Sequence, residues 1–310
     1  MRVLLTVRDV LSRFYGQYDT MIRLVCKFVL ALTAFASINQ ALGQMAILDN
    51  ILILLGLAVI CTFLPSNSIL LIGAALILGH FYGISLEAAV VGGGMLVIGI
   101  LLYFGISPDS ALPLILTALA QPIGLGCAPA LVFGLIGGPL SAVGAAFGAL
   151  IYYLIRVVAE HGGTLKATAA DAAEAMVQKM AMMIDYVITD REMLIAAGAL
   201  AAVLLIVYLI RIMEIKYAWN VAIAAGAVAY VAIYAAAALG QQLRVNWLWF
   251  LSGTLVSAMI AWLVQIMLFS LDYRRTENVR FEDDEYFYYV KAVPKKKVLR
   301  KKRKRRAEGR

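Results

Sequence analysis

One stretch of the chain, residues 28–155, contains neither lysine nor arginine. Its only acidic residues are Asp49, Glu87 and Asp109. A charged side chain at the centre of a lipid bilayer costs about 2.5–3.5 kcal/mol, so a stretch this long and this depleted in charge indicates hydrocarbon surroundings. Backbone polar groups in hydrocarbon must pair with one another, which leaves helices or closed β-barrels.

The apolar stretch comes in continuous blocks separated by glycine and proline, without the alternating pattern of barrel strands. The sequence therefore predicts an all-α, polytopic membrane protein. Its 310 residues, 63% of them hydrophobic, leave room for about eight to ten membrane crossings. The three cysteines lie in apolar blocks without paired spacing, so no disulfide framework, metal site or cofactor is expected.

The amino-terminal segment 1–21 is basic and amphipathic and precedes the first apolar block, 22–42. Such a segment is expected on the cytoplasmic face, with the block behind it crossing the membrane. A secretory signal is the alternative, because Ala34-Phe35-Ala36 has the form of a signal-peptidase site. The apolar character continues past that site, which favours a retained span.

Two successive parts of the membrane domain 22–158, residues 47–104 and 111–158, follow the same order of segments. Each has an apolar block, a short broken block and a long glycine-rich block. Two tandem units of three segments would run in opposite directions, and short interrupted segments are typical of transporter binding sites. The alternative is that glycine and alanine are enriched wherever membrane helices pack closely. The corresponding breaks are Pro65 and Pro122, then Gly83 and Gly137, and the short blocks are 69–82 and 123–136.

The connection 159–191 is hydrophilic, and its apolar residues recur every three to four positions, with Lys179 elsewhere on the helical wheel. This spacing predicts an amphipathic helix on the external surface, packed on the membrane domain or on lipid. Three further spans are expected within 192–271. The positive-inside rule places the basic loop 211–216 and both basic termini in the cytoplasm.

The carboxy-terminal segment 272–310 combines an acidic cluster, a run of aromatic and β-branched residues, and a polybasic tail. The aromatic run favours a short extended structure. Anionic lipid headgroups attract a polybasic tail by about 1 kcal/mol per basic residue, whereas nucleic-acid binding is the less favoured use. The residues expected to bind headgroups or a cytoplasmic protein partner are Tyr286, Tyr288, Lys295, Lys296, Lys297, Arg300, Lys301 and Lys302.

Four polar residues of the low-charge region are the candidates for a cavity or ion pathway: Asn67, His80, Glu87 and Gln121. An ionisable group at membrane depth is a functional hypothesis by default, although helix-start positions also explain the carboxylates. His80 and Glu87 would form a pair if the chain folds back between them. Gln121, followed by a proline and two nearby glycines, is the best candidate for unwound backbone that lines a cavity.

Sequence motifs for catalysis are absent: there is no Walker-type phosphate loop, H-E-x-x-H, G-x-S-x-G or C-x-x-C. The sequence therefore gives no starting point for an enzyme. Two carboxy-terminal patterns carry a resemblance, Asp272-Tyr273-x-Arg275-Thr276-Glu277 and Phe281-Glu282-Asp283-Asp284-Glu285-Tyr286-x-Tyr288-Tyr289-Val290-Lys291-Ala292-Val293-Pro294. With them the chain resembles a group of bacterial polytopic membrane proteins, often labelled ABC transporter permeases, for which no activity is established. The resemblance implies a bacterial plasma membrane.

The broken, glycine-rich central segments favour a transporter or permease-like protein, without identifying a substrate. The alternative is a non-transporting membrane scaffold that recruits a cytoplasmic, envelope or division partner through its carboxy-terminal segment. Loss of residues 279–310 distinguishes the two hypotheses, because only a scaffold would lose its main activity with the tail.

Overall fold

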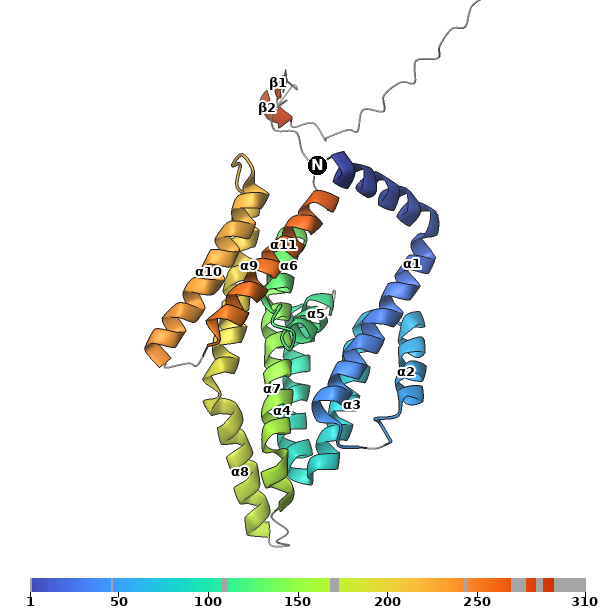
Figure 1. Cartoon of the computed structure of the whole chain (residues 1–310), viewed down its shortest axis with the longest axis vertical. Helices are drawn as coiled ribbons and strands as arrows, with labels where there is room; N and C mark the ends of the chain where they lie inside the picture. The colour runs from blue at the N-terminus through green and yellow to red at the C-terminus, as the bar shows by residue number, and fades with distance from the viewer. Residues whose placement is uncertain are drawn as a thin grey trace, which may run out of the picture. The chain divides into compact units, whose positions relative to one another are not determined.

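The computed structural model describes seven stretches of the chain, residues 2–45, 47–107, 111–167, 173–241, 245–268, 277–282 and 287–292. Over these stretches the chain forms eleven helices and one two-stranded sheet (Figure 1). Seven of these helices are long and apolar enough to cross a membrane, which confirms the expected all-α polytopic membrane class. The chain divides into two compact units, of which the larger is residues 20–262 and the smaller the described parts of 1–19 and 263–310.

Helix α1 (Arg2–Leu42) contains both the basic lead-in and the first apolar block. It bends at Tyr18, whose φ of −123° and ψ of 28° are not helical. The bend coincides with the boundary between the two units, so the lead-in and the span behind it are separate helical pieces. Ala31 and Phe35 are fully buried, which makes the second piece part of the core of the larger unit.

The next two helices are α2 (Ile51–Phe63) and α3 (Asn67–Ile84). The sequence predicts that the first is the longer one, but in the structure the second is longer. The sequence predicts a full span over 47–64 and a short segment over 69–82, whereas α2 has 13 residues and α3 has 18. Helix α2 begins late because Asn50 caps it, its side chain accepting a hydrogen bond from a backbone amide two residues on. Helix α3 reaches about 27 Å and is the longer of the two apolar helices.

Two glycines of α3 make room for the loop that precedes α2. An ideal Cβ at Gly79 would lie 2.5 Å from the Leu48 side chain, and one at Gly83 would lie 3.3 Å from the Gln44 carbonyl oxygen. Both glycines therefore let the loop between α1 and α2 approach the helix closely, and neither interrupts its backbone. The break that the sequence predicts at Gly83-Ile84-Ser85 is confirmed, since α3 ends at Ile84 and α4 begins at Leu86.

Helices α5 (Leu112–Ala120) and α6 (Cys127–Ile136) form a helical hairpin against α7 (Ser141–Ala167). Both outer ends of the hairpin lie at the start of α7. There, a Cβ at Gly144 would lie 2.9 Å from Pro113, and one at Gly137 would lie 2.6 Å from the Ser141 hydroxyl.

Helix α5 then runs alongside α7, because Gly148 packs directly on Thr117. At 9 and 10 residues, α5 and α6 extend only about 14 and 15 Å, roughly half of a hydrocarbon core. Neither helix is long enough to cross a membrane alone, and the pair forms a hairpin with the turn at residues 121–126 as its tip.

The two predicted repeat units share their order of helices and differ in packing. The third helix of the first unit, α4 (Leu86–Ile106), packs mainly on α3. The third helix of the second unit, α7, packs mainly on α5 and on α9 (Arg191–Ile212). The internal duplication stays a prediction, and the difference arises because α6 packs chiefly on α9, outside its own unit.

The hydrophilic connection contains helix α8 (Ala173–Thr189), which packs on α4 and α7. Among the side chains of α8 that the structure describes, those of residues 177–189, the buried ones are Lys179, Met183 and Val187, spaced four apart. Lys179 thus lies on the buried face, in contrast to the prediction that it lies elsewhere on the wheel. The reason is Glu87 at the start of α4, whose Oε1 is 3.6 Å from Lys179 Nζ and compensates the buried cation.

The substitution Lys179→Glu is expected to loosen α8 from α4, because it places a second carboxylate beside Glu87 in a site largely closed to water. Limited proteolysis of the solubilised protein between α7 and α8 would then become several times faster than for the wild type. The double variant Lys179→Glu/Glu87→Lys should restore much of the protection. Equal cleavage rates for all three proteins would contradict a structural role for this ion pair.

Helices α10 (Ala218–Gln241) and α11 (Trp247–Leu268) complete the helical part. The aromatic run that the sequence predicts as extended forms strand β2 (Phe287–Ala292), and a second strand that the sequence does not predict, β1 (Glu277–Glu282), precedes it. They pair antiparallel as a two-stranded sheet, with Glu277 opposite Ala292 and Glu282 opposite Phe287.

Candidate functional site

A cavity of about 270 Å³ lies at the tip of the α5–α6 hairpin. Gln121, Gly124 and Gly126 line it from the tip itself. Backbone outside a helix is tolerated at membrane depth only where it is buried in protein or lines a water-filled space, and this tip meets that condition. The other walls come from α7, α9, α10 and α11, mainly through Tyr153, Glu192, Tyr230, Tyr234, Trp249 and Phe250.

The conformation of the tip requires glycine. Gly124 has a φ of +74°, in the left-handed region that side chains other than glycine rarely adopt. On its other side, a Cβ at Gly253 of α11 would overlap the carbonyl oxygen of Gly124. The two glycines therefore allow α11 to rest directly on the backbone of the tip.

The amide of Gln121 is folded over the tip. A Cβ at Gly126 would lie 2.6 Å from Gln121 Oε1, so the absence of a side chain at Gly126 provides the space for this amide. Gln121 Nε2 is buried and has no hydrogen-bond partner within the described part of the chain. A buried amide donor without a partner costs about 1–3 kcal/mol, and a bound solute or water would satisfy it.

Aromatic rings of α10 and α11 line the cavity. The ring centroids of Tyr230 and Tyr234 are 4.9 Å apart, and Phe250 lies 5.0 Å from the first and 4.7 Å from the second. The Tyr230 and Phe250 rings are stacked, with 23° between their planes. These three rings from α10 and α11 are a preformed surface of π-faces and edges.

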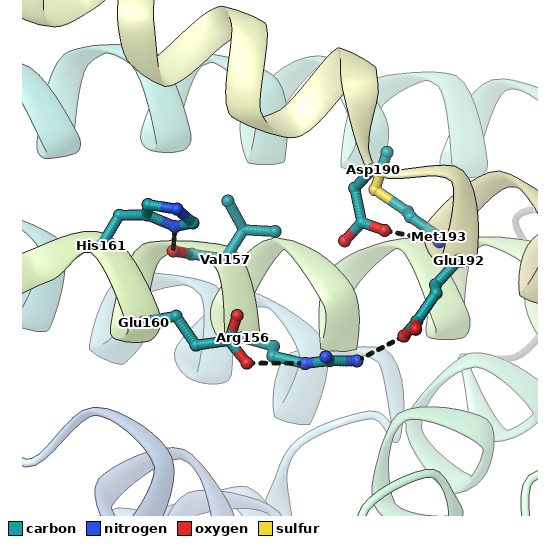
Figure 2. A network of polar contacts seen from close by, with 7 residues as sticks. All are labelled: Arg156, Val157, Glu160, His161, Asp190, Glu192 and Met193. Atoms are coloured by element: carbon teal, nitrogen blue, oxygen red, sulfur yellow. Dashed lines mark hydrogen bonds and ion pairs between the residues drawn. The ribbon is translucent and has the colours of Figure 1, made fainter. Parts of the chain in front are cut away.

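An ion-pair network centred on Arg156 of α7 includes the cavity residue Glu192 (Figure 2). Arg156 lies between two carboxylates: its Nε is 2.8 Å from Glu160 Oε1 on the same helix, and its Nη1 is 2.8 Å from Glu192 Oε2 on α9. The guanidinium carbon is also 5.7 Å from the centre of the Tyr153 ring. With one cation and two carboxylates, this network has a formal charge of −1, and Glu192 brings that charge to the cavity wall.

The backbone near this network is fixed by local contacts. Asp190 caps α9, because its Oδ1 accepts a hydrogen bond from the Met193 amide at 3.2 Å (Figure 2). The cap places Glu192 in the first turn of α9, where the helix dipole favours a carboxylate. His161 lies 3.0 Å from the Val157 carbonyl oxygen through Nδ1 and stacks on Tyr186 of α8.

His80, a candidate from the sequence, belongs to a separate polar cluster. It is fully buried, and its Nε2 is 2.9 Å from Asn39 Oδ1. Asn39 Nδ2 in turn donates to the Leu48 carbonyl oxygen at 2.7 Å and lies 3.4 Å from Asp49 Oδ1. This cluster ties α1 and α3 to the loop that follows α1. The pairing of His80 with Glu87 does not occur, since each has another partner.

Two other candidates occupy structural positions. Glu87 pairs with Lys179 and lies in the first turn of α4, which is capped by a hydrogen bond from the Ala88 amide to the Ser85 hydroxyl. Asn67 Oδ1 accepts a hydrogen bond at 2.9 Å from the backbone amide of the residue that precedes α5. Of the four candidates in the low-charge region, Gln121 is the one that lines the cavity.

Sequence reasoning missed the carboxylate and the tyrosines of this site. The available signals were the spacing of Arg156 and Glu160, four residues apart in an apolar helix, and the same spacing of Tyr230 and Tyr234. Glu192 gave a weaker signal, because a carboxylate in the first turn of a helix has an ordinary structural explanation.

A second, larger cavity of about 560 Å³ lies among α1, α3, α4, α5 and α7 and is lined mostly by aliphatic side chains. Its polar groups include Thr33, Ser37 and Gln40 on α1. The Thr33 hydroxyl is already bonded to backbone carbonyls of its own helix, which leaves this space with few groups for orienting a polar solute.

Tyr288, a candidate for partner binding, lies on β2 and is exposed. The other candidates of the tail, Tyr286 and the basic residues 295–302, lie outside the described residues. Within the described part of the chain, no group of three histidine, cysteine, aspartate or glutamate side chains could hold a metal ion. Comparison with protein-family models, curated proteins and solved structures gives no match.

Proposed function

We propose that this integral membrane protein is a permease-like transporter and that its solute pathway passes through the cavity at the hairpin tip. The observation that carries the proposal is the placement of unwound backbone and an unsatisfied amide, Gln121 Nε2, beside a cavity between apolar helices. Interrupted helices that present polar groups near mid-membrane are the recurring form of transporter binding sites. The described lining offers no nucleophile paired with a general base, so we propose transport and no catalysis.

The proposed setting is a bacterial plasma membrane with both termini in the cytoplasm. The resemblance of the carboxy-terminal pattern supports the compartment, and the basic loop 211–216 and basic termini support the orientation. That orientation needs an even number of crossings, so α2 is proposed to make the eighth beside the seven long helices. With eight crossings, α9 and α11 both begin at the external side. Glu192 and Trp249 lie in the first turns of these helices, so the cavity would be reached from outside the cell.

Cysteine accessibility tests the pathway. In a variant whose native cysteines are replaced by serine, Gln121→Cys is expected to react with a membrane-impermeant methanethiosulfonate reagent. Because a transporter opens alternately, the reaction should occur both in intact cells and in inverted vesicles. The control is Ala130→Cys on α6, a fully buried position that should stay unreactive from either side. Reaction from one side alone, or none, would contradict a transport pathway.

A scaffold function is the second candidate, and the paired strands β1 and β2 are the observation that favours it. A two-stranded sheet is marginally stable by itself and offers free edges, so it would gain stability by adding to the sheet of a cytoplasmic partner. The polybasic tail is then proposed to bind anionic lipid headgroups, with nucleic acid disfavoured. Deletion of residues 277–310 would abolish partner recovery for a scaffold and leave the two-sided reactivity of Gln121→Cys unchanged for a transporter.

A further inference from the structure

We infer that the cavity at the hairpin tip binds a small organic ammonium ion that also carries an oxygen acceptor. This inference rests on the proposed function and specifies the chemical class of its solute. Three properties of the cavity lead to it: its aromatic walls, its net negative charge, and an unpartnered amide donor at the hairpin tip.

The aromatic walls favour a cation. Five aromatic side chains line this one space, among them the cluster of Tyr230, Tyr234 and Phe250. Ring faces carry negative electrostatic potential and attract ammonium groups, more strongly where water is excluded. Tyr230 is 6% exposed, so its ring is largely removed from water. Aromatic walls of this kind also suit the apolar surface of an alkylated ammonium.

The charge of the site favours a cation as well. Among the described residues that line the cavity, Glu192 is the charged one. Its Oε2 is paired with Arg156, whereas its Oε1 has no hydrogen bond within the described part of the chain. Arg156 is shared with Glu160, so its single positive charge does not neutralise both carboxylates. The remaining negative charge would stabilise a bound cation and repel an anion.

The hairpin tip supplies the complementary end of the site. Gln121 Nε2 is a donor and cannot bind an ammonium group, but it would bind a hydroxyl or carbonyl oxygen of the same ligand. A volume of about 270 Å³ lies near the lower limit of small-molecule sites and restricts the ligand to a few heavy atoms between these ends. An amino alcohol has this combination of groups.

Binding of radiolabelled choline to the full-length purified protein in nanodiscs tests the inference. We expect saturable binding that is displaced by tetramethylammonium. The uncharged isostere of choline, 3,3-dimethyl-1-butanol, should displace it at least about tenfold less effectively, because it lacks the charge that Glu192 and the rings recognise. No saturable binding, or equal displacement by both competitors, would overturn the inference.

Variants test which residue binds the ammonium end of the ligand and which binds its oxygen. Glu192→Gln should weaken both choline and tetramethylammonium by about tenfold or more. Gln121→Leu should weaken choline severalfold and leave tetramethylammonium unchanged, since tetramethylammonium has no oxygen. Tyr230→Phe keeps the ring and should bind choline nearly as the wild type does. Equal loss of both probes in Gln121→Leu would contradict the assigned role of the amide.

Two controls separate recognition from structure. Glu160→Gln removes the carboxylate that shares Arg156 but does not line the cavity, and its effect on choline affinity should be well below that of Glu192→Gln. Glu214→Gln removes an exposed carboxylate from the loop after α9 and should have no effect. An equal effect of Glu160→Gln and Glu192→Gln would overturn the inference that Glu192 faces the ligand.

The binding assay tests the ammonium inference and the accessibility assay tests the transport proposal, so the two can be contradicted separately. If choline does not bind while Gln121→Cys reacts from both sides, the ammonium inference is wrong and the transport proposal remains. If choline binds as expected while Gln121→Cys reacts from one side, the transport proposal is wrong and the binding site remains.

Discussion

Replacing Gly253 by alanine is expected to lower the melting temperature of the solubilised protein by several degrees and to abolish binding at the hairpin tip. A Cβ at this position would overlap the carbonyl oxygen of Gly124. That oxygen belongs to a backbone held at a φ of +74°, so it cannot rotate away as a long side chain could. Overpacking of this kind costs about 1–3 kcal/mol, and here α11 must also retreat from the cavity wall.

The matched control for this prediction is Gly198→Ala on α9. A Cβ there meets nothing within 4 Å, so the change replaces one helical glycine by alanine without a clash. It should leave the melting temperature unchanged or raise it slightly, because alanine is the better helix former by up to about 1 kcal/mol. Differential scanning fluorimetry of the two variants in the same detergent measures the difference. Equal melting temperatures would contradict the contact between α11 and the tip.

The membrane class is predictable from the sequence because it depends on the charge and hydrophobicity of each residue taken singly. The absence of lysine and arginine over residues 28–155 needs no knowledge of contacts. The turn at 121–126 was also recognisable, since proline and glycine act on the backbone locally, and the structure places it at a cavity. Local chemistry therefore identified where the chain leaves the helical state.

Local chemistry could not identify what glycine does inside a helix. At Gly124 the backbone leaves the helical conformation and has a positive φ. At Gly79 the helix continues, and the missing side chain makes room for Leu48. The difference lies in the neighbour, which comes from another part of the chain. The sequence of one helix therefore does not distinguish a glycine that ends it from a glycine that admits a neighbour.

Ion pairs between residues distant in the sequence could not be predicted either. Lys179 is buried because a carboxylate 92 residues earlier in the chain meets it, and the helical wheel of α8 contains no information about that partner. Glu192 likewise gains its role from Arg156, 36 residues away. Pairings of this kind depend on how helices pack, which the periodicity of one helix does not determine.

The polar cluster around His80 gives the second strong stability prediction. Asn39→Leu is expected to destabilise the protein by roughly 1–3 kcal/mol. The substitution removes the donor to the Leu48 carbonyl oxygen and the partner of His80 Nε2 at once. Because His80 is fully buried and its Nδ1 already lacks a partner within the described residues, its ring would then have no hydrogen bond at either nitrogen. Gln40→Leu, at the adjacent exposed position, is the control and should have little effect.

A double-mutant cycle shows whether Asn39→Leu destabilises the protein because the His80 ring loses its hydrogen bond. His80→Leu should be milder than Asn39→Leu, since it deletes a nitrogen that is unsatisfied in the wild type and leaves Asn39 bonded to the loop. Asn39→Leu/His80→Leu should then be more stable than the sum of the single changes predicts, because neither nitrogen remains buried without a partner. Unfolding in a series of denaturing detergent concentrations measures all four proteins. Strict additivity would mean that the two side chains contribute independently, and that the hydrogen bond between α1 and α3 does not stabilise the packing of these helices.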